Sequence, residues 1–416
     1  MKVLWFEVSM PACYEDANRV VTGWQDALEN LVKTQSLDVE LIIAFESSVY
    51  HEVKVIDGIT YVPLNVNFSR FKYWNTNFWE IKTEKIIPKA VEIIKKIKPD
   101  IIHVFGTEWP FGLVANYTDI PVVIHIQGSM IPYNNALYPP GYNKYTAYKS
   151  LKWNLIKYVR HYLDTKHSYS RERVERKIWK SVKYYMGRTE WDKALANIMH
   201  PNCVYYHVDE ALRPDFMNSY RQWEFCKSSK VKLLTIAHSG TWYWKGIDML
   251  LKTAHIIKEM GIDFEWRLAG GIYETMKNTI EREENTTFLE NNVHFLGLTS
   301  PNELNELLLD STIYVHTSYV ENSPNAICEA QYLGVPIVST NVGGISSLCR
   351  NGKEATLVPA NDPWQMANAI IVLSQNENLM NCYSTNSITI SHKRHDYGNI
   401  ASQLMSCYSD IISLNT

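Results

Sequence analysis

Several features that define common protein classes are missing from this 416-residue sequence. Its seven cysteines are scattered and include no C-x-x-C pair, which argues against a disulfide framework and against a zinc site. No apolar run approaches the roughly 18 residues that a transmembrane helix needs, and the initial run Met1–Val8 contains Glu7, unlike a secretory signal. We therefore expect a cytoplasmic protein with reduced thiols, either soluble or peripheral on the inner face of the membrane.

Charge of one sign is also missing, and so are two common motifs. The formal net charge is only -3, so the chain as a whole is not built to bind nucleic acid. No G-x-G-x-x-G follows a predicted strand, which excludes a nicotinamide-dependent dehydrogenase. No Asp-x-Asp pair occurs, so a metal-dependent transferase of the other common fold is not expected, and we predict no catalytic metal and no cofactor.

What is present is an alternation of short β-branched runs and longer amphipathic stretches, which is typical of parallel sheets covered by helices. In the first half, strands are predicted at 2–8, 39–44, 101–104, 122–125 and 182–186, and helices at 17–33 and 81–97. In the second half, strands are predicted at 232–237, 265–269, 293–296, 313–316, 336–339 and 356–358. Helices are predicted between them at 247–260, 302–309, 325–333 and 363–373.

The chain is too long for one ordinary core, and its 46% hydrophobic content is that of a folded protein. Two Rossmann-like α/β domains are predicted over residues 1–207 and 231–390. They are joined by the polar, aromatic segment 208–230, whose apolar residues show neither helical nor strand periodicity. The final segment, 391–416, is predicted to form a helix that packs back on the first domain. Because ligands of open parallel sheets bind at the carboxyl ends of strands, residues that follow strands are the functional candidates.

The strongest cluster of candidates, residues 319–330, follows the predicted strand 313–316. Ser323 is a favourable N-cap and Pro324 a favourable first helical residue, so a helix is predicted to begin here. Its free amides and positive dipole end suit a phosphate. Glu321 precedes the helix and Glu329 lies two turns into it, so the two carboxylates reach different parts of an extended ligand. Taken alone, such a pair is more often an ordinary capped helix with solvated acids.

A second candidate segment, 237–248, runs from a strand end into a helix. Lys245 at the start of that helix is placed to neutralise a diphosphate leaving group, although a lone lysine there is more often solvated surface. Gly297 and Leu298 end another strand, and the glycine allows the backbone to approach a ring; a plain turn explains them almost as well.

In the first half, His125 ends the strand 122–125 and is predicted to face the interdomain cleft. A lone histidine at such a position is more often a structural residue whose hydrogen bonds are made within the protein. Asp16, Trp109 and Arg188 also follow strands. Among them, Arg188 is the best first-domain candidate for a phosphate contact.

Together these motifs resemble the retaining glycosyltransferases of the GT-B fold, specifically family 4, over roughly residues 231–373. The pair Glu321-x7-Glu329 is similar to that family's paired-glutamate motif. The following Gly334-Val335-Pro336-Ile337-Val338 and Gly343-Gly344 are similar to the segment after it. The resemblance implies two Rossmann-like domains that face each other across a cleft, with the acceptor on the N-terminal side and the nucleotide sugar on the C-terminal side.

The resemblance also implies a role for each candidate. Glu321 would contact hydroxyls of the donor sugar, Glu329 the nucleotide ribose, and His125 the neighbourhood of the reacting carbon. The implied catalytic residues are His125, Lys245 and Glu321. The implied donor-binding residues are Ser239, Gly240, Lys245, Gly297, Leu298, Glu321, Ser323, Pro324, Asn325, Ala326 and Glu329. The implied acceptor-side residues are Asp16, Trp109 and Arg188. Gly240 stands where the family usually has an arginine, so the usual Arg–Lys pair is incomplete.

The activity implied is metal-independent transfer of a sugar from a UDP- or GDP-linked donor to a hydroxyl, with retention at the anomeric carbon. The acceptor would be a sugar or a lipid-linked sugar in surface polysaccharide or glycolipid assembly. Two alternatives stay open. One is a sugar-nucleotide epimerase of the same fold. The other is a non-catalytic partner subunit, which the missing arginine at Gly240 allows and the presence of Lys245 with both glutamates opposes.

The segment Lys144–Arg188 is markedly basic and interleaved with aromatic residues such as Trp153, Tyr158 and Trp179. Such a helix suits the surface of an anionic membrane, where lipid-linked acceptors reside. An ordinary solvated helical face explains it equally well.

Overall fold

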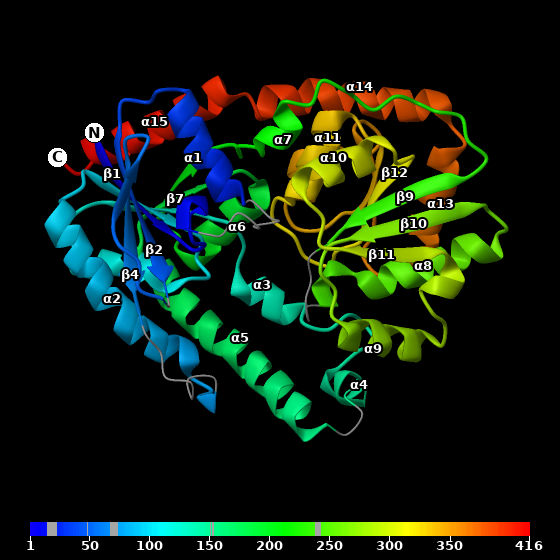
Figure 1. Ribbon diagram of the computed structural model, residues 1–416, viewed down its shortest axis with the longest axis horizontal. Helices are drawn as coiled ribbons and strands as arrows, with labels where there is room; N and C mark the ends of the chain where they lie inside the picture. Colours follow the sequence, from blue (N-terminus) through cyan, green and yellow to red (C-terminus); the bar gives the residue numbers. More distant parts are fainter. Residues whose placement is uncertain (15–22, 48, 67–73, 150, 152–153, 238–242) are drawn as a thin grey trace.

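The structure, a computed structural model, describes residues 1–14, 23–47, 49–66, 74–149, 151, 154–237 and 243–416. These residues form two α/β domains side by side, each built on one sheet (Figure 1). The predicted fold class is therefore confirmed at the level of the two sheets.

The N-terminal sheet has eight strands in the order β3-β4-β2-β1-β5-β6-β7-β8. Among the strands that the structure describes, β3 and β4 alone pair in antiparallel fashion. Both faces are covered by helices, so β1 and its neighbours are almost continuously apolar. The strands are β1 (Lys2–Glu7), β2 (Glu40–Ser47), β3 (Lys54–Ile56), β4 (Ile59–Asn65), β5 (Ile101–Phe105), β6 (Val122–His125), β7 (Tyr184–Gly187) and β8 (Val204–His207).

Helices α2 and α5 pack together on one face of this sheet, and α1 covers the other. The helices are α1 (Trp24–Thr34), α2 (Phe78–Ile97), α3 (Met130–Asn135), α4 (Lys144–Lys149), α5 (Leu155–Ser181) and α6 (Glu190–Met199), with a 3-10 helix over Pro110–Tyr117. The helix predicted at 17–33 begins at Trp24 in the described part of the chain, because residues 15–22 lie outside it.

The C-terminal sheet has six parallel strands in the order β11-β10-β9-β12-β13-β14. They are β9 (Val231–Ile236), β10 (Phe264–Ala269), β11 (Val293–Gly297), β12 (Ile313–His316), β13 (Ile337–Thr340) and β14 (Ala355–Val358). Its helices are α8 (Ile247–Glu259), α9 (Glu274–Glu284), α10 (Pro301–Leu309), α11 (Asn325–Leu333), α12 (Ile345–Leu348) and α13 (Pro363–Ser374). One core joins the strands to these helices.

The segment 208–230 contributes to both cores and is not a free tether. Val208 packs in the N-terminal core, whereas Phe216, on the short helix α7 (Pro214–Met217), packs in the C-terminal core. The chain crosses a second time between α14 (Glu377–Arg394) and α15 (Tyr397–Ser413), which lie end to end along one edge of the molecule (Figure 1). The boundary predicted at 391 therefore falls inside α14.

Helix α15 belongs to the N-terminal core. Its apolar face, including Ile400 and Leu404, is buried there. The Trp5 indole donates to the Tyr408 hydroxyl at 3.0 Å, and the same hydroxyl lies 2.6 Å from His103 Nδ1. Within the described part of the chain, no helix combines the length and the hydropathy that a bilayer span requires.

Candidate active site

Loops at the carboxyl ends of the two sheets meet between the domains. Asn322, after β12, accepts a hydrogen bond from the hydroxyl of Thr189, after β7, at 2.7 Å. Its amide nitrogen donates to the carbonyl of Gln127, after β6, at 3.1 Å. The rings of Tyr133 and Trp244 stack across the same junction, 4.9 Å apart and nearly parallel. The candidate residues of both halves therefore face one another.

Glycines allow the C-terminal loops to pack backbone against backbone. Gly246 has φ +70°, and a Cβ there would lie 1.9 Å from the Thr317 carbonyl oxygen. Gly343 has φ +52°, and a Cβ there would lie 1.7 Å from the Glu321 carbonyl oxygen. A side chain at either position would push the Glu321 loop away from its neighbours, which gives a physical reason for these two glycines.

Glu321 is held by three groups. The Lys245 ammonium donates to its Oε1 at 2.5 Å, the Ser318 hydroxyl donates at 2.8 Å, and His316 Nε2 lies 3.4 Å away. Burial opposes ionisation of Glu321, but Lys245 and His316 outweigh it and bring the pKa to about 2. The carboxylate is thus charged at neutral pH. Sequence reasoning placed Lys245 and Glu321 in one site, and the structure joins them directly.

The start of α11 corrects the predicted cap. The helix spans Asn325–Leu333, as its predicted range has it, but its N-cap is Pro324, and Ser323 does not cap it. The Ser323 hydroxyl donates instead to the buried carboxylate of Glu210 at 3.1 Å, because a charged acceptor offers the stronger hydrogen bond. The first amides of α11, including Asn325 and Ala326, have no acceptor within the helix. They remain suitable for an anion.

Arg188 reaches the same point from the N-terminal domain. Its Nε lies 2.9 Å from Glu210 Oε2, and both side chains are buried. Burial raises the pKa of Glu210, and Arg188 opposes the increase. Arg188, Glu210 and Ser323 thus connect the end of β7, the interdomain segment and the start of α11. Glu210 was not predicted from the sequence, because a lone acid in a segment without periodicity carries no signal.

Glu329 is fully buried on α11 and paired with an arginine that the sequence did not indicate. Arg213 Nε and Nη2 donate to Glu329 Oε1 at 2.8 and 2.7 Å. Burial raises the pKa of Glu329 to about 7, although Arg213 favours the charged form. Among the described residues, nothing hydrogen-bonds to Oε2 of Glu329. That oxygen is itself buried, so it is a polar atom left unsatisfied in the interior.

His125 is buried at the end of β6, with its ring centre 5.4 Å from that of His103. Burial lowers its pKa well below the usual value, and nearby His103 and Arg188 add to the effect. The imidazole is therefore neutral at pH 7. The structure places it at the carboxyl edge of the N-terminal sheet, two residues before Gln127.

The remaining candidates lie apart from this centre or outside the described residues. Trp109 packs edge-on against Trp79, with the Arg171 guanidinium 4.7 Å from its ring centre. Gly297, at φ +75°, ends β11. The exposed Leu298 follows it and lines a hollow of about 860 Å³ beside α10. Asp16, Ser239 and Gly240 lie outside the described residues.

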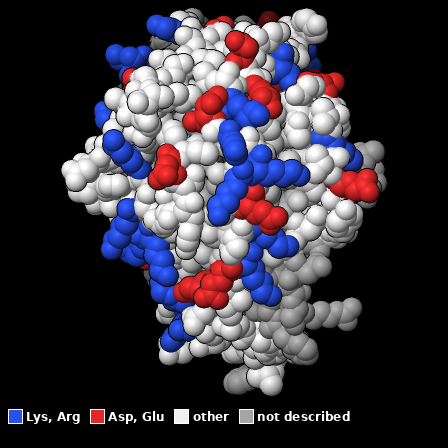
Figure 2. Space-filling model, turned by 90° about the vertical axis from the view of Figure 1, so that its left-hand side faces the viewer, with Lys and Arg blue, Asp and Glu red and all other residues white. Residues whose placement is uncertain are grey.

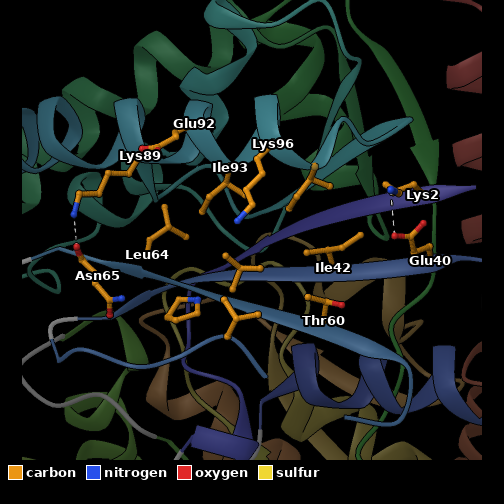
Figure 3. A pocket seen from close by; sticks show the side chains of 14 residues that line it. Lys2, Glu40, Ile42, Thr60, Leu64, Asn65, Lys89, Glu92, Ile93 and Lys96 are labelled. Carbon is orange, nitrogen blue, oxygen red and sulfur yellow. Dashed lines mark hydrogen bonds and ion pairs between the residues drawn. The ribbon is translucent and has the colours of Figure 1, made fainter. Parts of the chain in front are cut away.

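A separate groove of about 540 Å³ runs along β4 beneath α2 (Figure 3). Ile93 and Lys96 point from α2 toward the strands, Lys89 donates to the Asn65 carbonyl, and Lys2 pairs with Glu40. None of the candidate residues lines this groove. We therefore do not include it in the site.

The predicted basic segment is only partly available to a membrane. Arg171 donates to the Glu108 carbonyl, Arg173 pairs with Glu80, and Arg176 pairs with Glu172. The first turns of α5 are different: Leu155 and Ile156 are 75% and 80% exposed, and the neighbouring Lys157 is exposed as well. Lys152 and Trp153 lie outside the described residues.

Comparison with known structures defines the fold class. A sucrose-phosphate synthase from Thermosynechococcus elongatus superposes with a TM-score of 0.71 at 13% identity, over 99% of both chains. Anabaena Alr3699/HepE in complex with UDP and glucose superposes with a TM-score of 0.64 at 13% identity, over 98% of this chain and 99% of that one. The architecture is the GT-B fold of glycosyltransferases.

Sequence comparison defines the family. The profile described as "Glycosyl transferases group 1" matches residues 224–389, and the one described as "Glycosyl transferase 4-like" matches residues 16–158. The chain belongs to the family-4 glycosyltransferases. It is 30% identical over 138 residues to WcaL of Escherichia coli K12, which is named as a colanic acid biosynthesis glycosyltransferase. The match covers 32% of this chain and 33% of that protein. It is 27% identical to the amylovoran biosynthesis glycosyltransferase AmsK of Erwinia amylovora, over 32% of this chain and 34% of that protein. The matches thus span about a third of the length of these curated relatives.

Proposed function

We propose that this protein transfers a sugar from a UDP- or GDP-linked donor to an acceptor hydroxyl, with retention at the anomeric carbon, in the assembly of a surface polysaccharide or glycolipid. The observation that carries the proposal is the junction of Lys245, Glu321 and the start of α11, which faces Arg188 from the opposite domain. The family membership and the polysaccharide-related names of the relatives support it.

In the proposed reaction, the bond from the anomeric carbon to the diphosphate oxygen breaks and a bond to the acceptor oxygen forms on the same face. The acceptor's hydroxyl proton passes to the departing diphosphate. Lys245 and the first amides of α11 stabilise the charge that develops on the diphosphate. Glu321 accepts hydrogen bonds from the sugar hydroxyls, and Oε2 of Glu329 accepts one from the ribose.

The second positive charge, absent at Gly240, is proposed to come from Arg188. Its guanidinium is buried and joined through Glu210 to Ser323 at the start of α11. Arg188→Ala should lower donor turnover by at least about tenfold, the effect of losing one charged contact to the leaving group. Turnover equal to that of wild type would exclude this role.

A panel of nucleotide sugars tests the activity. The protein is incubated with UDP- and GDP-linked sugars, and both thermal shift and release of the nucleoside diphosphate are measured, with Lys245→Ala as the inactive control. Stabilisation and turnover by one donor are expected. A donor converted to its epimer without release of diphosphate would identify an epimerase, and an absence of binding across the panel would refute the proposal.

The reaction is proposed to need no divalent metal, because Lys245 and a helix start supply the positive charge. Turnover measured in excess EDTA should match turnover in buffer alone. Complete loss of activity with EDTA, restored by manganese or magnesium, would show that a metal takes part.

We also propose that the first turns of α5 contact an anionic bilayer. The exposed Leu155 and Ile156 lie beside Lys157 there, and exposed apolar and basic side chains together favour such a surface. The outer face of the N-terminal domain mixes basic and acidic side chains (Figure 2), so it offers no comparable surface of one sign.

A further inference from the structure

One segment of the N-terminal domain crosses to the C-terminal domain and packs on it. Residues 136–149 follow α3, end with α4 and are followed by α5. Helix α4 lies beside α9, on the side of the molecule opposite α14 and α15 (Figure 1). We call residues 136–149 the strap. It joins the two domains away from the two places where the chain passes between them.

The apolar part of the strap packs on the two loops that carry the proposed donor contacts. Leu137 is buried in one cluster with Trp244 and Val320 of the C-terminal domain. Trp244 directly precedes Lys245 in the sequence, and Val320 directly precedes Glu321. Because this cluster draws its side chains from both domains, its burial stabilises the protein only while the domains are together.

The polar part of the strap is connected to the loop after β12. The Tyr142 hydroxyl donates to Glu284 Oε1 at 2.6 Å, and the same oxygen lies 3.3 Å from Lys252 Nζ. Lys252 Nζ is also 3.2 Å from Asp248 Oδ2, to which the Tyr319 hydroxyl donates at 2.8 Å. A continuous series of hydrogen bonds and ion pairs therefore runs from the strap to the loop that follows β12.

Two further contacts hold the strap on the C-terminal domain. Arg282 on α9 donates to the Thr146 carbonyl at 2.7 Å. The ring centres of Tyr138 and Tyr142 lie 5.9 and 5.8 Å from that of Tyr243. Tyr138 and Tyr142 are only partly buried against the C-terminal core. The strap can therefore leave this surface while that core stays intact.

The strap is attached to its own domain at both ends. Just before it, Asn134 Nδ2 donates to Glu172 Oε2 at 2.7 Å and to the Ser168 carbonyl at 3.3 Å, both on α5. Near its end, the Tyr148 ring stacks on that of Tyr158 on α5, with centres 4.9 Å apart. The strap therefore moves with the N-terminal domain when the domains separate.

The proposed donor contacts are closed off from solvent in this arrangement. Glu321, Ser323 and Arg188 are only 6, 8 and 7% exposed. A bound ligand of the size of a nucleotide sugar buries most of its surface, so it reaches these groups only when the domains separate. That separation draws Leu137 away from Val320, because the two residues belong to different domains.

We propose that the strap gates the donor site. It holds the domains closed over a bound nucleotide, and it leaves the loops of Lys245 and Glu321 before a nucleotide enters or departs. The proposal rests on the donor site proposed above and adds how access to that site is controlled. Because Trp244 and Val320 lie under the strap, its release also loosens both loops.

Amide hydrogen exchange of the nucleotide-free protein tests whether the strap holds these loops. Leu137→Ala/Tyr142→Phe removes the buried apolar contact and one hydrogen-bonding hydroxyl. Exchange in residues 243–247 and 317–322, measured by mass spectrometry, should become at least about tenfold faster. Tyr148→Ala, in the same strap but facing α5, should leave it unchanged. Tyr142→Phe alone creates no cavity and should give a smaller increase.

Stopped-flow fluorescence with mant-UDP and mant-GDP tests the gate itself. Association and dissociation should both be faster in Leu137→Ala/Tyr142→Phe, by a factor similar to that of amide exchange, and unchanged in Tyr148→Ala. Unchanged amide exchange in the double variant, or an equal increase in Tyr148→Ala, would overturn the proposal. If a nucleotide binds and its rates stay at the wild-type values in the double variant, the gate alone fails. If neither nucleotide binds to wild type, the proposed activity fails.

Discussion

The least expected residue is Arg213. It pairs with one oxygen of the fully buried Glu329 carboxylate, and the other oxygen has no hydrogen-bond partner among the described residues. If that oxygen binds the ribose, Glu329→Gln should weaken UDP or GDP binding by at least about tenfold, since a charge-assisted hydrogen bond contributes about 1.5–3 kcal/mol. The glutamine retains an oxygen for Arg213, so the fold should persist. Isothermal titration calorimetry measures the effect.

A matched control is available in the same domain. Glu354 is also fully buried and pairs with Arg350, but it lies outside the candidate site. Glu354→Gln should leave nucleotide affinity unchanged. Equal affinities for wild type and Glu329→Gln would remove Glu329 from the donor site.

Glu321 makes stability depend on pH in a defined direction. Its pKa of about 2 lies below the value near 4.3 of an unfolded chain. Its ionisation therefore stabilises the fold above about pH 4.3, and this contribution disappears as the pH falls toward 2. Relative to Glu321→Gln, wild type should gain on the order of 3 kcal/mol at pH 7 and much less at pH 3.

Urea unfolding of both proteins at pH 7, 5 and 3 measures this difference. Glu306→Gln, at an exposed carboxylate that pairs with Arg221, should stay within about 0.5 kcal/mol of wild type throughout. A gap between wild type and Glu321→Gln that is the same at pH 7 and pH 3 would contradict the ion-pair assignment.

At the scale of elements, most buried strands could be predicted from their apolar runs, but β3, β4 and β8 could not. Strand β4 contains Pro63, which usually argues against a strand. It is tolerated because β3 pairs only as far as Tyr61, so the proline nitrogen needs no partner on that side. Strand β3 has two exposed residues among its three, and therefore has no apolar pattern.

Site residues could be predicted where they follow a strand. They could not be predicted where their role depends on an ion pair with a residue far away in the sequence. Lys245 stands before a helix and Glu321 follows a strand, and Glu329 lies on the helix after Glu321, so local sequence indicates all three. Arg213 and Glu210 lie in the interdomain segment, and only the packing of both domains around it gives them partners.

We predict that the start of α5 binds anionic membranes. Wild-type protein should sediment with phosphatidylglycerol vesicles at low salt and be released as salt rises, because each basic side chain near the surface contributes about 1 kcal/mol. Leu155→Asp/Ile156→Asp should abolish this binding, and Lys177→Glu/Lys180→Glu, at the other end of α5, should reduce it only slightly. Sedimentation of the aspartate variant equal to that of wild type would make this helix start an ordinary solvated surface.

At the scale of the whole molecule, Asn322 joins the domains through hydrogen bonds to Thr189 and Gln127. Asn322→Ala should open the protein, which a larger radius of gyration in small-angle scattering would record. Donor turnover should fall about tenfold, because two neutral hydrogen bonds of about 0.5–1.5 kcal/mol each are lost. Asn305→Ala, which removes a buried amide bonded to Asp215, should change neither quantity. An unchanged radius and rate in Asn322→Ala would show that this contact does not hold the domains together.

The two crossings of the chain between domains lie side by side. His395 Nδ1 is 2.7 Å from the Glu210 carbonyl, the Tyr397 hydroxyl donates to the Leu212 carbonyl at 3.0 Å, and the Asp209 amide donates to Gln403. Because both crossings lie on one edge, the domains can rotate about the line through them. Twisting or sliding of one domain against the other would strain the contacts between the crossings. When the domains move apart, the edge of the molecule opposite the two crossings is therefore expected to separate furthest.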